Sequence, residues 1–324
     1  MKKNGIVSNR TNKRDAGSFL LFVFLLPYVC ASLWGHVGEE IHRGENRDKQ
    51  EDAYMVAAMV DWGVWELPAS EYLTYQLYLS MPGECEQEAR KAQAVLLRTE
   101  LAAMYEEAAD RKVDVDGEGL AGFYRDKDEA WEETLQPFRR VVEETAGEIL
   151  TYQGKPIRAS YFKVSNGQTR AAGKAGGEDS PYLAAVSCEQ DKNAPDYRSV
   201  VKVDRNVYTE KLRRALGGDY EEEELWGRGK FVFDGSGYMT SVSYCNREGE
   251  EKKVDGETYR HLFGLASASF EMEQEEERVV FYVTGVGHGF GMSQYTADCK
   301  AKDGAGYERI LSDFFLPAEL EKFE

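Results

Sequence analysis

Residues 84–111 read ECEQEARKAQAVLLRTELAAMYEEAADR, a stretch rich in alanine, glutamate, leucine and arginine. Apolar or weakly polar side chains recur in it at three- and four-residue spacing: Ala89, Ala92, Leu96, Thr99 and Ala103. This period predicts a long amphipathic helix. Pro82 and Gly83 stand just before it and mark its start.

The segments around this helix mix strands and helices. A strand is expected within 52–64, a second helix at 129–146, and a hairpin of strands at 148–152 and 156–164 with its turn at 153–155. Further strands are expected at 198–203, 231–233, 239–244 and 278–284, and further helices at 208–216 and 307–315. Because strands and helices do not alternate regularly, the pattern predicts an α+β fold with a mixed, largely antiparallel sheet.

Composition limits the classes of partner. The chain has 324 residues, a formal net charge of -18 and a pI near 4.8. No surplus of lysine and arginine exists to neutralise phosphates, so a nucleic-acid partner is not expected. The acidic runs 221–224 and 273–277 are typical of a solvated surface.

The N-terminus differs from the rest of the chain. Residues 16–35 carry no charge, and basic residues precede them: Lys2, Lys3, Arg10, Lys13 and Arg14. About 20 apolar residues can cross a bilayer as a helix, and a basic flank stays on the cytoplasmic side. We therefore expect a cytoplasmic tail (1–15), a single transmembrane signal anchor (16–35), a linker (36–51) and an extracytoplasmic domain (52–324).

Two other interpretations of residues 16–35 are a cleaved signal peptide and a buried core helix. The terminal position and the basic flank disfavour a core helix. Residues 29–32, Val-Cys-Ala-Ser, form a poor small-residue cleavage site, which favours the anchor over the cleaved peptide. The sequence predicts a protein of the cell membrane with its C-terminal domain outside.

Four cysteines follow the anchor, at positions 85, 188, 245 and 299. They are widely spaced and form no C-x-x-C pair, so a zinc ribbon is not indicated. An oxidising compartment permits one or two disulfides among them, and free buried thiols fit equally well.

The densest functional pattern is Gly285-Val-Gly-His-Gly-Phe-Gly-Met-Ser-Gln-Tyr295, directly after the expected strand 278–284. Glycines at alternate positions let backbone approach a ligand closely. The order of glycines does not fit a dinucleotide fingerprint or a phosphate loop. The candidate binding residues are Gly287, His288, Gly289, Met292, Ser293, Gln294 and Tyr295. A purely structural glycine-rich turn is the alternative.

A second polar segment, Tyr161-Phe-Lys-Val-Ser-Asn-Gly-Gln-Thr169, ends the expected hairpin. Its donors and acceptors suit sugar hydroxyl and acetamido groups. The candidate binding residues are Ser165, Asn166, Gly167, Gln168 and Thr169. Ser-Asn-Gly is also an ordinary turn sequence.

Three blocks in this order resemble the stage II sporulation protein D family. The first holds Leu67-Pro-Ala-Ser-Glu-Tyr-Leu73, Met81-Pro82, 88–94 and Arg98-Thr99; the second holds 146–157 and 161–169; the third holds 287–295 and 306–311. The resemblance covers about residues 65–320. It implies a peptidoglycan-acting domain, with glycan strands as substrate and no cofactor.

The resemblance implies lytic transglycosylase activity, because family members with known activity cleave glycan strands freed of stem peptides in this way. The implied chemistry needs one carboxyl group, which protonates the glycosidic oxygen and then assists closure of an anhydro ring by the sugar's own 6-hydroxyl. The family's glutamate immediately precedes Met-Pro, where this chain has Ser80. A serine cannot act as that acid, and Glu84 is the candidate replacement, with Glu88 a weaker one. Helix-terminal carboxylates without a catalytic role are the alternative.

Some relatives also hold zinc through cysteine and histidine after the long helix, but residues 112–131 contain neither, so no metal is expected. Two functions remain open. One is a glycan-cleaving enzyme with an unusual acid. The other is an inactive glycan-binding homologue that positions or enhances a partner cell-wall hydrolase, as amidase enhancers of the family do. A Ser-His hydrolase built on Ser80 or Ser293 with His288 lacks a nucleophile elbow and an orienting acid.

Overall fold

The computed structural model describes residues 53–60, 63–81, 84–117, 119–120, 122, 129–172, 180–217 and 220–323. The expected cytoplasmic tail, membrane anchor and linker lie outside these residues. Across the part of the chain that is described, no helix combines the length and apolar character needed to cross a membrane. All the described residues belong to one compact unit that begins near Glu51.

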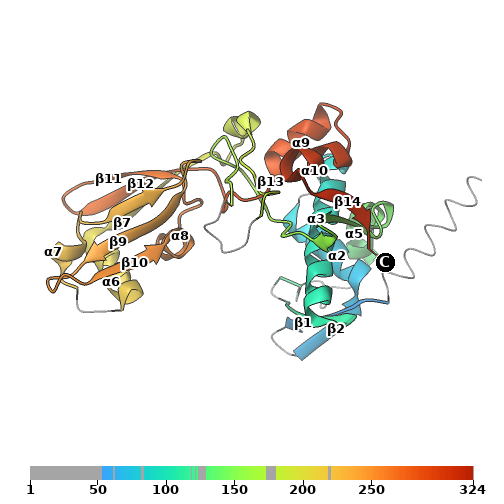
Figure 1. Cartoon of the computed structure of the whole chain (residues 1–324), viewed down its shortest axis with the longest axis horizontal. Helices are drawn as coiled ribbons and strands as arrows, with labels where there is room; N and C mark the ends of the chain where they lie inside the picture. The colour runs from blue at the N-terminus through green and yellow to red at the C-terminus, as the bar shows by residue number, and fades with distance from the viewer. Residues whose placement is uncertain are drawn as a thin grey trace, which may run out of the picture. The chain divides into compact units, whose positions relative to one another are not determined.

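The long helix is confirmed as α3 (Gln87–Ala108), and it organises the first of two hydrophobic clusters. It packs against α2 (Ala69–Ser80), α5 (Glu129–Glu144), α9 (Gln294–Lys302) and α10 (Tyr307–Phe315). Figure 1 places α9 and α10 together near one end of α3. Four of the residues that predicted the helix are completely buried: Ala89, Ala92, Leu96 and Thr99.

Thr99 ties α3 to a strand that crosses it. Its Oγ1 accepts a hydrogen bond from the Leu150 N–H at 2.9 Å. Arg98, also buried, donates from Nη2 to the Val142 carbonyl of α5 at 2.9 Å. Because buried backbone groups need partners, these two side chains fix the helix relative to its neighbours.

Two small sheets flank this cluster. One has the order β2-β1-β3, from β1 (Met55–Val60), β2 (Gly63–Pro68) and β3 (Lys112–Asp116). The other has the order β14-β4-β5, from β4 (Glu148–Tyr152), β5 (Lys155–Pro156) and β14 (Glu319–Lys322).

The second hydrophobic cluster is aromatic and lies between two antiparallel sheets and their helices. The sheets have the orders β11-β12-β7 and β10-β9-β8 (Figure 1). Their strands are β7 (Arg198–Asp204), β8 (Lys230–Phe233), β9 (Met239–Cys245), β10 (Glu251–Asp255), β11 (Phe270–Gln274) and β12 (Arg278–Thr284). The helices are α6 (Arg205–Leu216), α7 (Glu222–Leu225) and α8 (Gly256–Phe263).

Three tyrosine hydroxyls inside this cluster satisfy one another. The Tyr208 hydroxyl lies 2.9 Å from that of Tyr244 and 3.0 Å from that of Tyr259. The cluster is therefore closed around its own polar groups, as buried hydroxyls require.

The antiparallel α+β prediction is confirmed, with differences in detail. The strands form several small sheets instead of one, and two pairings are parallel: β1 with β3, and β6 (Tyr161–Phe162) with β13 (Met292–Ser293). The single strand expected within 52–64 is two strands. The returning strand expected at 156–164 pairs with β4 only at 155–156. The helix α2 was not predicted.

Candidate functional site

The two polar segments singled out from the sequence run beside each other. Val164 and Val286 exchange both backbone hydrogen bonds, with N···O distances of 3.1 and 2.7 Å. Further along, the Arg170 N–H donates to the Gly289 carbonyl at 2.7 Å. Together with the β6–β13 pairing, these contacts join two segments that are more than a hundred residues apart in sequence.

One buried carboxylate, Asp191 in the short 3-10 helix η2 (Glu189–Asn193), holds both segments. The Ser165 N–H donates to Asp191 Oδ2 at 2.6 Å, and Ser293 Oγ donates to both carboxylate oxygens at 3.0 and 2.8 Å. Thr296 Oγ1 donates to Oδ1 at 2.7 Å. Asp191 therefore fixes the two segments to each other. It was missed because an isolated aspartate outside any motif resembles a surface residue.

The structure places the predicted binding residues in two groups. Some are buried: Ser165, Thr169, Gly289, Met292 and Ser293. The others are half-buried: Asn166, Gly167, Gln168, Gly287, His288, Gln294 and Tyr295. Direct contact with a sugar stays a prediction for both groups, and the half-buried residues are the accessible ones.

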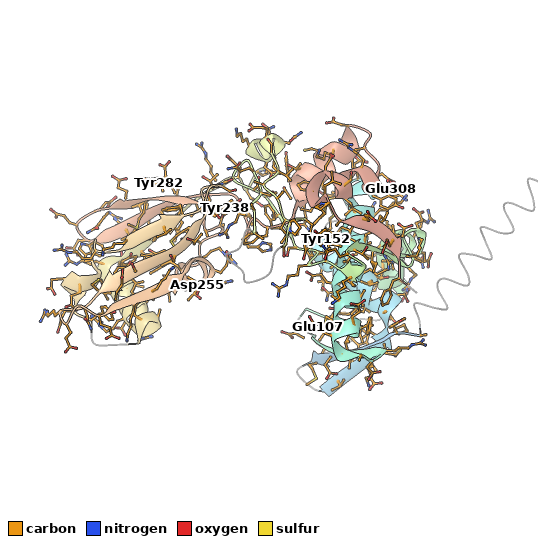
Figure 2. All side chains as sticks on the ribbon, viewed as in Figure 1. Glu107, Tyr152, Tyr238, Asp255, Tyr282 and Glu308 are labelled. Carbon is orange, nitrogen blue, oxygen red and sulfur yellow. The ribbon has the colours of Figure 1, made fainter. Side chains whose placement is uncertain are left out.

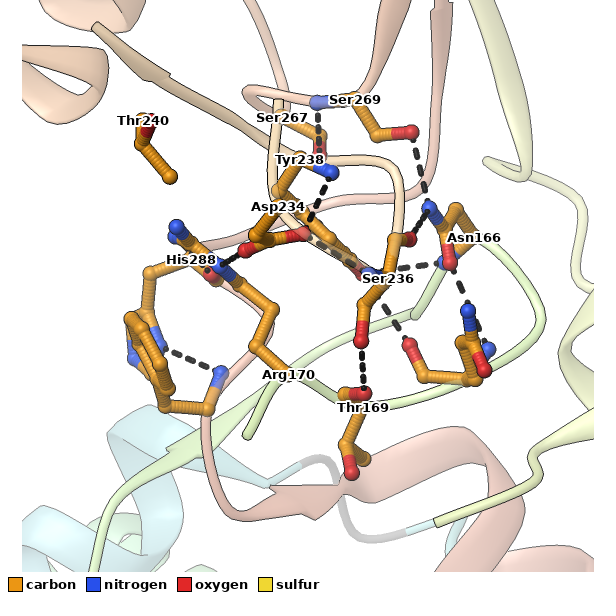
Figure 3. A network of polar contacts seen from close by, with 12 residues as sticks. Asn166, Thr169, Arg170, Asp234, Ser236, Tyr238, Thr240, Ser267, Ser269 and His288 are labelled. Atoms are coloured by element: carbon orange, nitrogen blue, oxygen red, sulfur yellow. Dashed lines mark hydrogen bonds and ion pairs between the residues drawn. The ribbon is translucent and has the colours of Figure 1, made fainter. Parts of the chain in front are cut away.

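Asn166 forms its hydrogen bonds with other protein groups, as Figure 3 shows. Its Nδ2 donates to the Ser236 carbonyl at 2.8 Å and to Ser269 Oγ at 2.9 Å. Its backbone N–H donates to the Tyr238 hydroxyl at 3.1 Å. The side chain therefore fastens the 161–169 segment to the aromatic cluster.

The glycine-rich segment needs glycine because neighbouring side chains leave no room. A Cβ at Gly287 would lie 2.7 Å from Phe162 Cβ, and one at Gly289 would lie 2.7 Å from the Tyr238 ring. Atoms do not pack at such distances, so a larger residue would displace the segment.

His288 lies between the rings of Phe162 and Phe290, at centroid distances of 5.7 and 6.1 Å. Its Nδ1 accepts a hydrogen bond from the Phe290 N–H at 3.1 Å. Burial lowers the pKa of His288 below its usual value, and the charge of Glu257 opposes that shift. The neutral ring is thus the form that the segment needs.

We expect His288 to make stability depend on pH. Because its folded pKa is depressed, the unfolded chain takes up the proton first as pH falls below about 6.5, and the fold loses stability until the folded pKa is passed. His288→Asn offers Oδ1 as the acceptor without titrating. Melting temperatures between pH 8 and pH 5 should therefore fall less in His288→Asn than in the parent. His261→Asn, at an exposed histidine, is the control. An identical change of melting temperature with pH in all three proteins would contradict the assignment.

Gln294 connects the glycine-rich segment to Ser80. Its Nε2 donates to the Ser80 carbonyl at 2.9 Å and to Gln93 Oε1 at 3.2 Å. Ser80 ends α2 and is half-buried. Ser80, the residue that the resemblance aligns with the family's catalytic glutamate, therefore lies beside α3 and the start of α9.

Glu84 is exposed, in the turn before α3. It adjoins Cys85, whose thiol has Asp298 and Lys302 as charged neighbours. The weaker candidate, Glu88, accepts a hydrogen bond from the Tyr307 N–H at 3.0 Å and so caps α10. A catalytic role for Glu84 stays a prediction.

Sequence reasoning gave no role to Glu100, a glutamate of α3 whose pKa is raised. Glu100 lies two helical turns after Gln93 on the same face of α3. Its side chain reaches solvent, yet surrounding protein atoms raise its pKa by burial, with the charge of Arg158 opposing. No motif marks this glutamate, because helical periodicity gives only its face.

Two tyrosines complete this neighbourhood. Burial raises the pKa of Tyr161, the charge of Glu100 adds to the shift, and an interaction with Ser80 opposes it. Burial also raises the pKa of Tyr72 to about 12, with further contributions from Tyr161 and Glu100. The charge of Glu100 therefore acts on both tyrosines, and Tyr161 also interacts with Ser80.

A recess of about 350 Å³ has Arg158 in its lining. Its lining mixes charged and polar side chains with apolar ones, and apolar atoms form the larger part of its surface: Arg158, Ser160, Arg170, Ala172, Ser180, Leu183, Met239, Thr240, Asp255, Gly256, Glu257 and Phe290. Figure 2 labels Asp255, at the end of β10. The volume falls within the range of ligand pockets, roughly 300 to 1,000 Å³.

Arg170 is fixed at the wall of this recess. Its Nε donates to Asp234 Oδ2 at 2.7 Å, and its guanidinium lies 4.3 Å from the centre of the Phe290 ring (Figure 3). Its Nη1 donates to the His288 carbonyl at 3.2 Å. Arg170 is therefore committed to the structure, whereas Arg158 is exposed.

The described residues contain no group of three or more histidine, cysteine, aspartate or glutamate side chains placed to hold a metal ion. The cysteines at 85, 188, 245 and 299 are free thiols.

Comparison with known proteins agrees with the sequence pattern. A family model described as stage II sporulation protein matches residues 62–152. Stage II sporulation protein D of Bacillus amyloliquefaciens is 30% identical over 270 residues, which cover 80% of this chain and 76% of that protein. The protein of the same name from Bacillus subtilis (strain 168) is 29% identical with the same coverage. An uncharacterised protein of Brachyspira hyodysenteriae is 27% identical over 258 residues, covering 77% and 66% of the two chains.

Proposed function

The chain belongs to the stage II sporulation protein D family, and on that premise we propose that it binds glycan strands of peptidoglycan in sporulation or cell-wall remodelling. The related proteins carry sporulation in their names. Glycan as the ligand comes from the family resemblance and from the chemistry of the recess.

We further propose that residues 16–35 hold the protein to the cell membrane with its C-terminal domain outside. The support is the uncharged stretch with its basic N-terminal flank. An extracytoplasmic domain would meet peptidoglycan directly. The proposed partners are glycan strands and other membrane-anchored cell-wall hydrolases.

The observation that carries the glycan proposal is the recess of about 350 Å³, which residues next to the 161–169 segment and one residue of the glycine-rich segment help to line. Arg170 comes from the strand-loop segment just after Thr169, and Phe290 comes from the glycine-rich segment. Asp255, Glu257, Ser160 and Thr240 add acceptors and hydroxyls of the kind that hydrogen-bond to sugars.

Arg158 gives the recess a feature specific to peptide-free glycan. Removal of stem peptides leaves lactyl carboxylates on the strand, and an arginine pairs well with a carboxylate. The chain as a whole has a formal net charge of -18 and would repel such a strand. An exposed arginine at the mouth of the recess therefore provides local attraction.

Ser80 favours a second candidate function, a homologue that binds glycan without cutting it and positions or enhances a partner hydrolase. The hydroxyl cannot supply a proton as a carboxylic acid does near neutral pH. The Gln294 contact to the Ser80 backbone is compatible with a site that is intact in shape and altered in chemistry.

Co-sedimentation of the full-length chain, kept in detergent, with purified peptide-free glycan tests the proposal. We expect saturable binding that weakens about tenfold in Arg158→Ala, because a hydrogen bond to a charged group contributes roughly 1.5 to 3 kcal/mol. Arg214→Ala, an exposed arginine on α6, is the matched control and should bind like the parent. Absence of saturable binding by the parent would overturn the proposal.

A further inference from the structure

We propose that the recess of about 350 Å³ receives the acetamido group of an N-acetyl sugar, and that Glu257 is the residue that selects for this group. The inference deepens the proposed function and rests on it, because the ligand is the same glycan strand. It names the substituent that the recess recognises. Sugars of the strand that have lost their acetyl groups should then bind weakly.

The first ground is the state of the polar groups in the lining. Most of them are already bonded within the protein. The Asp255 Oδ1 atom accepts the Thr258 N–H at 3.0 Å, and its Oδ2 accepts the Thr258 hydroxyl at 2.6 Å, so this carboxylate caps α8. The Thr240 hydroxyl donates to a backbone carbonyl at 3.1 Å, and Arg170 bonds to a carboxylate and to a backbone carbonyl. These groups have little left to offer a ligand.

Glu257 differs from them. Its Oε2 accepts a hydrogen bond from Arg260 Nε at 2.7 Å, whereas its Oε1 has no hydrogen-bond partner among the residues that the structure describes. Solvent barely reaches this oxygen, yet the side chain is 36% exposed and lines the recess. The last torsion of a glutamate is soft, so a small rotation turns the oxygen toward a ligand. A shielded acceptor without a partner is destabilising, and a donor on the ligand removes that cost.

The second ground is the apolar part of the lining. Four of its side chains are apolar: Ala172, Leu183, Met239 and Phe290. An acetamido group carries a methyl group, an N–H donor and a carbonyl acceptor. The methyl group suits the apolar walls, and the N–H suits the free oxygen of Glu257. The half-buried Ser160, in the same lining, has a hydroxyl that can donate to the carbonyl.

The charges of the lining disfavour the alternative substituent, the ammonium group of a de-N-acetylated sugar. The lining holds two carboxylates and two arginines, so its charges balance. Glu257 is also paired with Arg260. The recess therefore offers a cation no net negative charge. An ammonium group would lose its water against apolar walls, which costs more than transferring a neutral amide.

The first test is co-sedimentation of the full-length chain, kept in detergent, with peptide-free glycan that is untreated, chemically de-N-acetylated, or de-N-acetylated and then re-acetylated. The parent should bind the untreated strand at least tenfold more tightly than the de-N-acetylated one. The latter has lost the apolar contact of the methyl group and brings a charge to apolar walls. Re-acetylation should restore binding, which shows that the chemical treatment itself did no damage.

The second test is Glu257→Gln, which keeps the size of the side chain. Arg260 still requires an oxygen at the Oε2 position, so the amide nitrogen takes the place of Oε1 and presents a donor instead of an acceptor. Binding of untreated glycan should weaken about tenfold, as for the loss of a hydrogen bond to a charged group. Glu210→Gln is the matched control, because Glu210 also pairs with an arginine three residues on but lies on α6, outside the recess.

The outcomes separate this inference from the proposed function. Equal binding of untreated and de-N-acetylated glycan, tighter binding of the de-N-acetylated strand, or unchanged binding by Glu257→Gln would each overturn the acetamido assignment and leave glycan binding intact. A parent that binds none of the glycan preparations would overturn both. The comparison of glycan forms uses the parent protein, so it decides the question even where a variant fails to fold.

Discussion

Replacing Asp191 with alanine is expected to destabilise the domain by about 3 to 5 kcal/mol, because it leaves several buried donors without an acceptor and each such donor costs roughly 1 to 3 kcal/mol. The carboxylate is completely buried and accepts hydrogen bonds from Ser165, Ser293 and Thr296. Its loss leaves a buried backbone N–H at Ser165 without an acceptor.

The melting temperature should fall by roughly 10 °C, since a domain of this size loses about 2 to 4 °C per kcal/mol. Thermal unfolding followed by circular dichroism measures the change. Asp196→Ala is the control, because Asp196 is exposed and its ion pair with Lys163 lies at the surface, where such pairs contribute little. Equal melting temperatures for Asp191→Ala and Asp196→Ala would contradict the assigned role.

Elements with a strong local pattern were predictable from the sequence. The long helix was expected at 84–111 and lies at 87–108; the strand 278–284 and the helix 307–315 coincide with β12 and α10. In each case, the side-chain period and a breaking residue act over one segment, so no distant contact is needed to recognise it.

Other elements depend on tertiary contacts and were missed. The helix α2 contains threonine and tyrosines that suit a strand equally well, and its helical state follows from burying Leu73 and Leu77 in the first cluster. Residues 53–60 form a continuous apolar run, and apolar residues return at Trp62 and Val64, so only Asp61 and Gly63 mark the division into two strands.

The two segments of the site were predictable from the sequence, but the role of each residue within them was not. Serine, threonine and asparagine in a loop look the same whether they bind a sugar or another loop, and here Thr169 accepts the Val186 N–H at 2.8 Å while Asn166 binds Ser236. Glu100 is the opposite case, a residue that no sequence pattern marks. Its environment comes from Arg158 and Tyr161, which lie about sixty residues away in sequence.

Replacing Gly291 with alanine should also destabilise the domain strongly, here because of backbone geometry. Gly291 has φ of 78°, where an L-residue costs about 1 to 2 kcal/mol. An added Cβ would also lie 1.9 Å from the Ser160 carbonyl oxygen, which accepts the Met292 N–H at 3.0 Å. The clash would separate β6 from β13, so we expect a total loss of about 3 kcal/mol or more.

Gly154→Ala separates the two contributions. Gly154 has φ of 73°, close to that of Gly291, but a Cβ added there would meet no heavy atom within 4 Å. Gly154→Ala should lose only the stability that the positive φ costs an L-residue, about 1 to 2 kcal/mol. The excess in Gly291→Ala then measures the contact with Ser160, and it should be accompanied by weaker glycan binding because both polar segments meet there. Equal destabilisation by the two substitutions would mean that the β6–β13 junction yields without cost and does not hold the site together.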